Sequence, residues 1–157
     1  MTESTSIIPM MDGGEIEDYM TKDPLIKPYF KGVYATDEIE RLDFNPPYIV
    51  IVNTQPSYLD GKHWICMFID QQEKEHFDSL GNPPLPTMKR FLTKMGGCYQ
   101  FNKERLQHPS TNSCGHFCLY YSYYKCRGYS MKDILNKFNS DLMVNSYKVY
   151  YFYEMTS

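Results

Sequence analysis

The sequence predicts an α+β protein in which helices pack on a small, mostly antiparallel sheet. Residues 48–53 (YIVIVN) form an unbroken, mainly β-branched run, which is typical of a strand buried on both faces. Residues 63–70 (HWICMFID) and 75–79 (EHFDS) are two further strand-like segments separated by a short turn, which favours antiparallel pairing. From residue 114 onward, aromatic residues recur at helical spacing. Strands in the centre and helices in the last third together indicate the α+β class.

The remaining elements follow from shorter patterns. Residues 1–14 are polar, contain Pro9 and end in two glycines, so we expect a flexible arm. Asp37 and Glu40 have capping-box spacing, which predicts a short helix over residues 38–42. Ser130 can cap a helix that follows it. Residues 141–153 also suit a strand, but we predict a helix. The other expected elements are helices over 16–20, 88–94, 114–125 and 131–138, and strands over 29–34 and 98–102.

Composition limits the function classes. At 157 residues, 42% of them hydrophobic, the chain fits one folded domain over residues 1–157. The net charge of −3 and the lack of any Lys/Arg run argue against nucleic-acid binding, and no apolar segment is long enough to cross a membrane. The number of cysteines, five, is odd, and residues 1–11 lack the basic start and long apolar run of a secretory signal. We therefore expect free thiols in a reducing, intracellular setting.

Cys114 is the best candidate nucleophile. It follows Asn112 and Ser113, precedes Gly115, and stands where an aromatic helix is expected to begin. The free N–H groups and the dipole of a helix N-terminus favour an anion, and a thiolate is the reactive form of cysteine. Gly115 allows another backbone to approach closely, because it has no side chain.

Three further residues complete a set for thiol-based peptide hydrolysis. His63 stands at the start of one expected strand and Asp78 at the end of the next, so antiparallel pairing can bring the carboxylate to the imidazole. The amide of Gln107, seven positions before Cys114, can fold back to form an oxyanion hole with the Cys114 N–H. Trp64 is expected to pack beside His63 and shield it from water.

The other cysteines and histidines have simpler interpretations. Cys66, Cys118 and Cys126 are expected to be inert, buried thiols. His116 should point away from Cys114, whereas His108, next to Gln107, remains a minor alternative base. Cys114, His116 and Cys118 lie on one helix and cannot converge on a tetrahedral zinc ion, so no metal site is expected.

The order His63-Trp64, then Phe77-Asp78-Ser79, then Gln107, then residues 112–115 (NSCG) resembles the adenovirus protease (adenain) family and its SUMO-deconjugating relatives. The segments 28–34 (PYFKGVY) and 51–54 (IVNT) are similar to the N-terminal half of adenain. The similarity extends from about residue 29 to residue 124. The chain is shorter than adenain, and this length favours a family member from a virophage or a polinton transposon.

The resemblance implies a SUMO-protease-like fold and a role for each site residue. His63 would be the base, Asp78 the orienting acid, Gln107 an oxyanion-hole donor and Cys114 the nucleophile. Adenain itself generally carries Glu at the acid position, so Asp78 is closer to the deconjugating relatives. Adenovirus members use DNA and a disulfide-linked peptide as activators. Cys98 lies in a comparable region at a different spacing and the chain is acidic, so we expect no cofactor.

The function expected from this resemblance is a maturation endopeptidase that cleaves capsid and other structural precursors at small, Gly-containing sites. A ubiquitin-like deconjugase and an inactive binding or capsid-associated protein are the alternatives. We expect a monomer whose partner is its protein substrate, in the host cytoplasm or a viral factory, with packaging in the virion left open. Residues 11–15 (MDGGE) resemble such cleavage sites, so self-cleavage after Gly14 is a hypothesis beside the simpler one of a flexible Gly pair.

Overall fold

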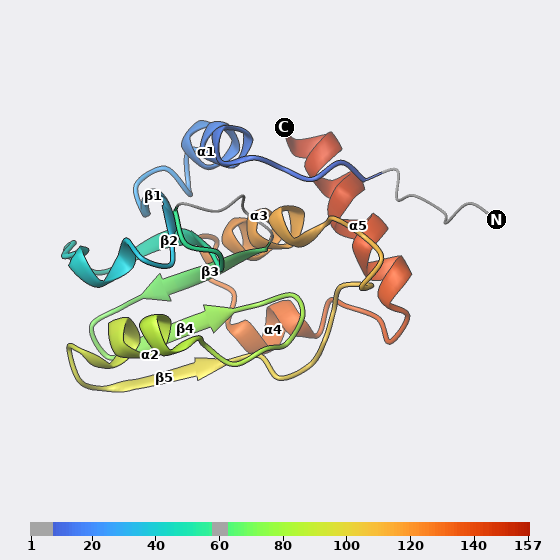
Figure 1. Ribbon diagram of the computed structural model, residues 1–157. Helices are drawn as coiled ribbons and strands as arrows, with labels where there is room; N and C mark the ends of the chain where they lie inside the picture. Colours follow the sequence, from blue (N-terminus) through green and yellow to red (C-terminus); the bar gives the residue numbers. More distant parts are fainter. Residues whose placement is uncertain (1–7, 58–62) are drawn as a thin grey trace.

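The structure, a computed structural model, describes residues 8–57 and 63–157 (Figure 1). Within these residues the chain forms a five-stranded sheet and five α-helices, so the predicted α+β class is confirmed. Residues 1–7 of the expected arm and residues 58–62 before His63 lie outside the described part. The elements in chain order are α1 (Gly13–Lys22), β1 (Phe30–Ala35), the 3-10 helix η1 (Ile39–Arg41), β2 (Tyr48–Asn53), β3 (Trp64–Ile69), β4 (Glu73–Phe77), α2 (Pro86–Thr93), β5 (Cys98–Phe101), α3 (Cys114–Lys125), α4 (Met131–Leu135) and α5 (Leu142–Thr156).

The strands follow one another in the sheet in chain order, β1-β2-β3-β4-β5. The two central pairings, β2 with β3 and β3 with β4, are antiparallel, as the short turn between β3 and β4 predicted. The two outer pairings, β1 with β2 and β4 with β5, are parallel. The expectation of a mostly antiparallel sheet is therefore wrong, because half of the pairings in the described sheet are parallel. Each parallel pair needs a crossover connection, and η1 and α2 lie in these two crossovers.

Helices cover both faces of the sheet, which explains why β2 is buried along its whole length (Figure 1). Ile49 and Ile51 face a core formed with α1, α3, α4 and α5. Val50 and Val52 face the second core, which contains residues of η1 and α2. Side chains alternate between the two faces of a strand, so a six-residue strand with no polar side chain before Asn53 fits this central position.

The last third of the chain is helical, as predicted. α3 begins at Cys114 and ends at Lys125, which are the predicted bounds, and Ser130 caps α4 by accepting from the N–H of Asp133. The ambiguous segment 141–153 is the helix α5, whose N-cap is Asp141. Aromatic rings join α3 to α5, because Tyr120 packs edge-on against Phe152 with 5.0 Å between ring centroids. The C-terminal end of α5 lies beside α1 in Figure 1.

Residues 8–14, the described part of the expected arm, correct the prediction of a flexible segment. Ile8 and Met11 are buried, and α1 begins at Gly13, three residues before the expected start. Asp12 and Glu15 form a capping box, in which each side chain accepts from the other residue's backbone N–H. The bond after Gly14 therefore lies in the first turn of a capped helix, and not in the extended form that a peptidase cleaves. This geometry speaks against self-cleavage there.

Candidate active site

His63 and Asp78 meet at the ends of two paired strands. The antiparallel register of β3 and β4 sets Cys66 opposite Phe77, so the residue before β3 and the residue after β4 lie at the same edge of the sheet. Nε2 of His63 lies 2.6 Å from Oδ1 of Asp78, and the ionised carboxylate can only accept, so the imidazole donates. The strand-end geometry expected from the sequence is thus present.

The carboxylate of Asp78 is held rigidly by its own backbone. Oδ1 also accepts from the N–H of Leu80 at 2.8 Å, which closes a local turn. Asn102, directly after β5, binds the main chain of Asp78 through both ends of its side-chain amide. Its Oδ1 accepts from the Asp78 N–H at 2.9 Å, and its Nδ2 donates to the Asp78 carbonyl at 2.6 Å. Asn102 is 2% exposed and was missed by the sequence reasoning. The only signal for it is an amide residue directly after a strand.

Cys114 is the first residue of α3 and is 2% exposed. Its Sγ accepts a hydrogen bond from the backbone N–H of Trp64 at 3.4 Å. The thiol therefore lies against the residue that follows His63, and two donor environments face it: the Trp64 N–H and the N-terminus of a 12-residue helix. Both place partial positive charge next to the sulfur.

The imidazole of His63 interacts with both neighbours at once. Burial lowers the pKa of His63, but the hydrogen bonds to Asp78 and Cys114 and the negative charges of these two residues outweigh burial and raise this pKa from 6.5 to about 9. Because Nε2 is bonded to Asp78, Nδ1 is the ring nitrogen left for the thiol. At neutral pH the ring is therefore an imidazolium between a carboxylate and a sulfur.

Gln107 is buried at 4% exposure, with its amide held at both ends. Oε1 accepts from the hydroxyl of Ser79 at 2.6 Å, and Nε2 donates to the carbonyl of Thr111 at 2.8 Å. Since the Thr111 carbonyl can only accept, this pairing fixes which end of the amide is nitrogen. Two backbone bonds, from the N–H groups of Leu106 and Gln107 to the Ser79 carbonyl, tie the loop to the strand end that carries Asp78. One Nε2 hydrogen stays available for a further acceptor.

Two polar residues of α5 support the loop that carries Gln107. Asn145 donates from Nδ2 to the Leu106 carbonyl at 3.2 Å, and the hydroxyl of Ser146 accepts from the N–H of His108 at 3.0 Å and from the Thr111 hydroxyl at 3.2 Å. Asn145 and Ser146 are fully buried. No pattern in the sequence indicated that this aromatic helix positions the loop.

The N-terminal segment forms one side of the site. The indole Nε1 of Trp64 donates to the Met11 carbonyl at 2.9 Å, and a Cβ on Gly115 would lie 3.0 Å from the Met11 Cβ. Met11 therefore packs directly over the residue after the nucleophile. Two hollows, of about 370 and 260 Å³, both have Trp64 and Asn53 in their walls, and the first is also lined by Met11. Trp64 is 8% exposed.

The other histidines and cysteines do not join this arrangement. His108 binds Ser110 through Nδ1, and His116 lies between the rings of Tyr150 and Tyr153. Burial raises the pKa of the thiols of Cys66, Cys118 and Cys126, that of Cys126 to about 12, which agrees with the inert role predicted for them.

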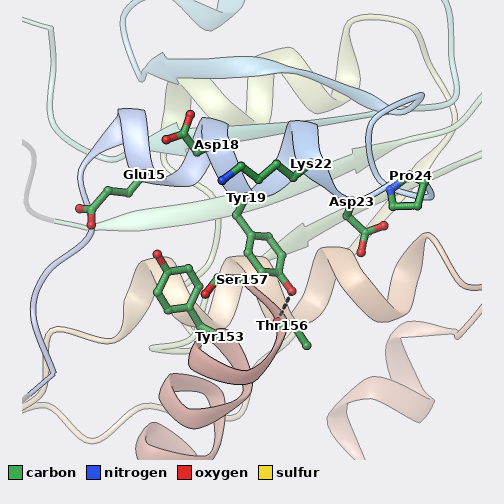
Figure 2. Close-up of a pocket in the computed structure, with 9 residues that line it drawn as sticks. All are labelled: Glu15, Asp18, Tyr19, Lys22, Asp23, Pro24, Tyr153, Thr156 and Ser157. Carbon is green, nitrogen blue, oxygen red and sulfur yellow. Dashed lines mark hydrogen bonds between the residues drawn. The ribbon is translucent and has the colours of Figure 1, made fainter.

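Another hollow, of about 440 Å³, lies elsewhere, between α1 and the C-terminal end of α5 (Figure 2). Its walls include Glu15, Asp18 and Asp23 together with Tyr19, whose hydroxyl bonds to that of Thr156 at 2.7 Å. None of the four candidate site residues lines it. In residues 8–57 and 63–157 no group of His, Cys, Asp and Glu could hold a metal ion, and no helix is long and apolar enough to cross a membrane.

Comparisons with known proteins bear on the fold. The fold is similar to the crystal structure of the ASFV pS273R protease, with a TM-score of 0.62 and 18% sequence identity over 90% of this chain and 66% of that protease. At this level of identity the likeness is one of fold. The SUMO protease Ulp1, with its catalytic cysteine oxidised to a sulfenic acid, also matches, with a TM-score of 0.47 and 12% identity over 92% of this chain and 78% of Ulp1. No protein-family model and no curated protein sequence matches the chain. The chain spans about two thirds of the length of the ASFV protease.

Proposed function

We propose that this protein is a cysteine endopeptidase in which Cys114 is the nucleophile, His63 the base, Asp78 the carboxylate that orients the base, and Gln107 an oxyanion-hole donor. One observation carries the proposal: the His63 ring links the Asp78 carboxylate to the thiol at the start of α3. A charged imidazole between a carboxylate and a thiol at a helix N-terminus is the arrangement that makes cysteine a nucleophile near neutral pH.

The reaction follows from these positions. The Cys114 thiolate attacks the peptide carbonyl carbon, and the resulting oxyanion is held by the free Nε2 hydrogen of Gln107 and the backbone N–H of Cys114. The His63 imidazolium gives its proton to the departing amine, so the C–N bond breaks and a thioester to Cys114 remains. Neutral His63 then takes a proton from the water that attacks the thioester. Release of the acid product returns the thiolate and the imidazolium.

The substrate class is inferred from the narrowness of the site. Cys114 is 2% exposed, Met11 packs over Gly115, and the hollows that meet at Trp64 are small. A peptide with bulky residues before the scissile bond would collide with these groups, whereas Gly would pass. We therefore infer cleavage at small, Gly-containing sites. The resemblance of the sequence to adenain-type proteases supports viral capsid or other structural precursors as substrates, in a virophage or polinton-type element.

The experiment is incubation of purified protein with capsid precursors, with Cys114→Ala as the matched control. Specific fragments with the wild type and none with Cys114→Ala support the proposal, whereas no processing by either would refute the maturation role. A second test compares two thiol reagents, a small alkylating agent and a ubiquitin-like protein with a C-terminal warhead. Labelling of Cys114 by the small reagent alone favours the endopeptidase. Labelling by the modifier would instead indicate a deconjugase, and failure of both with folded protein would indicate an inactive binding protein.

A further inference from the structure

A second hollow opens directly beside the catalytic pair. It has a volume of about 400 Å³ and lies at the sheet edge formed by the ends of β3 and β4, on the face that α2 covers. His63 and Asp78 form part of its wall, and Ile65, Leu85 and Met88 give it an apolar lining. Cys114 is on the other face of the sheet, at the start of α3, so His63 lies between the thiol and this pocket.

The pocket contains a buried polar group that the fold leaves unpaired. His76 is 1% exposed and lines the pocket from β4, with Met67 and Phe101 as its neighbours on the adjacent strands. Its side chain makes no hydrogen bond within the described residues, and its Nδ1 is fully enclosed. A buried polar group without a partner costs about 1–3 kcal/mol, so such a group in a pocket wall indicates a ligand that pairs with it.

The state of His76 limits what can pair with it. Burial lowers the pKa of His76 to about 4, so the ring is neutral at pH 7, with one nitrogen as donor and the other as acceptor. Rotation of the ring about its Cβ–Cγ bond exchanges the sides that Nδ1 and Nε2 face, so either can be presented to the pocket. The wall of the pocket also carries both charges of the Asp78–His63 pair. The carboxylate would repel an anionic ligand, and the imidazolium would repel a cationic one.

The chemistry of peptide cleavage places the substrate next to this pocket. His63 must protonate the departing amine, so the nitrogen of the residue after the scissile bond lies within hydrogen-bond reach of the His63 ring. The side chain of that residue then starts beside a wall of the pocket. His76 of β4 lies two residues before Asp78, which directly follows the strand, a separation of roughly 7 Å along an extended chain. This distance is comparable to the length of a tyrosyl side chain.

We propose that this pocket is a specificity site for the residue that follows the scissile bond, and that it takes a tyrosine-like side chain with an apolar ring and a neutral hydroxyl bonded to His76. The proposal rests on the proposed peptidase function. The apolar lining of Ile65, Leu85 and Met88 suits the ring, and a thioether beside an aromatic ring is a favourable contact. Phenylalanine would fill the same space but leave His76 unpaired.

The test measures binding without catalysis, using the folded Cys114→Ala protein. Two peptides that represent the released product differ only in their first residue, Tyr or Phe. We expect the Tyr peptide to bind about five- to tenfold more tightly, the ratio that one neutral hydrogen bond gives. Adding His76→Leu should bring this ratio to about one. The matched control is His116→Leu, which removes the other buried histidine with an unpaired Nδ1, on the opposite side of the sheet, and should leave the ratio unchanged.

The outcomes separate this proposal from the peptidase proposal. Equal binding of the two peptides, a ratio that survives His76→Leu, or no binding of either peptide at millimolar concentration would overturn the pocket assignment, even if wild type cleaves capsid precursors. A Tyr preference that depends on His76 supports the pocket, even if no precursor is cleaved and the peptidase proposal fails. With an active wild type, the same Tyr-to-Phe ratio should appear in kcat/KM for peptides that span the cleavage site.

Discussion

Replacement of Asp78 by Asn tests the charge relation at the centre of the site. Asn keeps the shape of Asp, and its Oδ1 can still accept from Nε2 of His63 and from the Leu80 N–H, so the variant removes a charge without removing an acceptor. In the wild type the pKa of His63 is raised to about 9 from 6.5, a difference that corresponds to about 3 kcal/mol in favour of the imidazolium. The loss of a contacting carboxylate should lower this pKa by roughly one to three pH units.

The sign of the effect on stability follows from proton linkage. A group whose pKa is higher in the folded than in the unfolded state contributes stability that is fully present below its unfolded pKa. For His63 this stability is lost as the pH rises from 6.5 through about 9, at about 1.4 kcal/mol per pH unit. Asp78→Asn should therefore be less stable than wild type by about 1–3 kcal/mol near pH 6, and this difference should shrink toward pH 10.

Two assays measure this effect. Urea unfolding of both proteins at several pH values gives the stability difference, and NMR titration of the His63 ring gives its pKa directly. In the activity profile, the alkaline limb of kcat/KM should lie near pH 9 for wild type, where the imidazolium is lost, and at lower pH for Asp78→Asn. A stability difference that is independent of pH, together with an unchanged His63 pKa, would show that Asp78 does not stabilise the imidazolium.

Three further predictions concern the residues around the thiol. Gln107→Ala should lower kcat by roughly 10²–10³-fold with little change in KM, because it removes a proposed oxyanion donor; an unchanged kcat would exclude that role. Asn145→Ala should cost about 2–3 kcal/mol in urea unfolding and lower kcat as well, because it leaves buried groups of the Gln107 loop unpaired, whereas the control Met155→Ala, 84% exposed on the same helix, should stay within about 0.5 kcal/mol of wild type. Gly115→Ala should lower activity, because its Cβ would lie 3.0 Å from the Met11 Cβ, and Met11→Ala in the same protein should restore part of it; a fully active Gly115→Ala protein would show that this contact is unimportant.

Local patterns were enough to predict the helix that begins at Cys114. The bounds of α3 agree with the prediction because the aromatic spacing that marks this helix is local. The approach of His63 to Asp78 was also predictable, because a short turn joins their strands and fixes the register of the pair. In both cases the information lies within about 15 residues of sequence.

Contacts between distant segments could not be predicted in the same way. The parallel pairings of β1 with β2 and of β4 with β5 depend on crossovers, which leave no periodic signal in the strands themselves. Met11 looked like part of a loose arm because its neighbours are polar and glycine-rich, yet its carbonyl is bonded to Trp64, which lies 53 positions later. Asn145 reaches a loop 39 positions earlier. Nothing near these residues in the sequence indicates their partners.

The site is thus assembled from three supports that meet only in the folded protein. The sheet edge holds His63 and Asp78, α3 holds Cys114, and the loop held by α5 carries Gln107. The separations between these supports are set by packing, above all where Phe77 of β4 stacks on Tyr121 of α3 with 4.7 Å between ring centroids. Because Phe77 directly precedes Asp78, this stack ties the carboxylate to the helix that begins at Cys114. Core packing therefore sets the geometry of the site, because a well-packed interior fixes the position of the nearly buried thiol relative to His63.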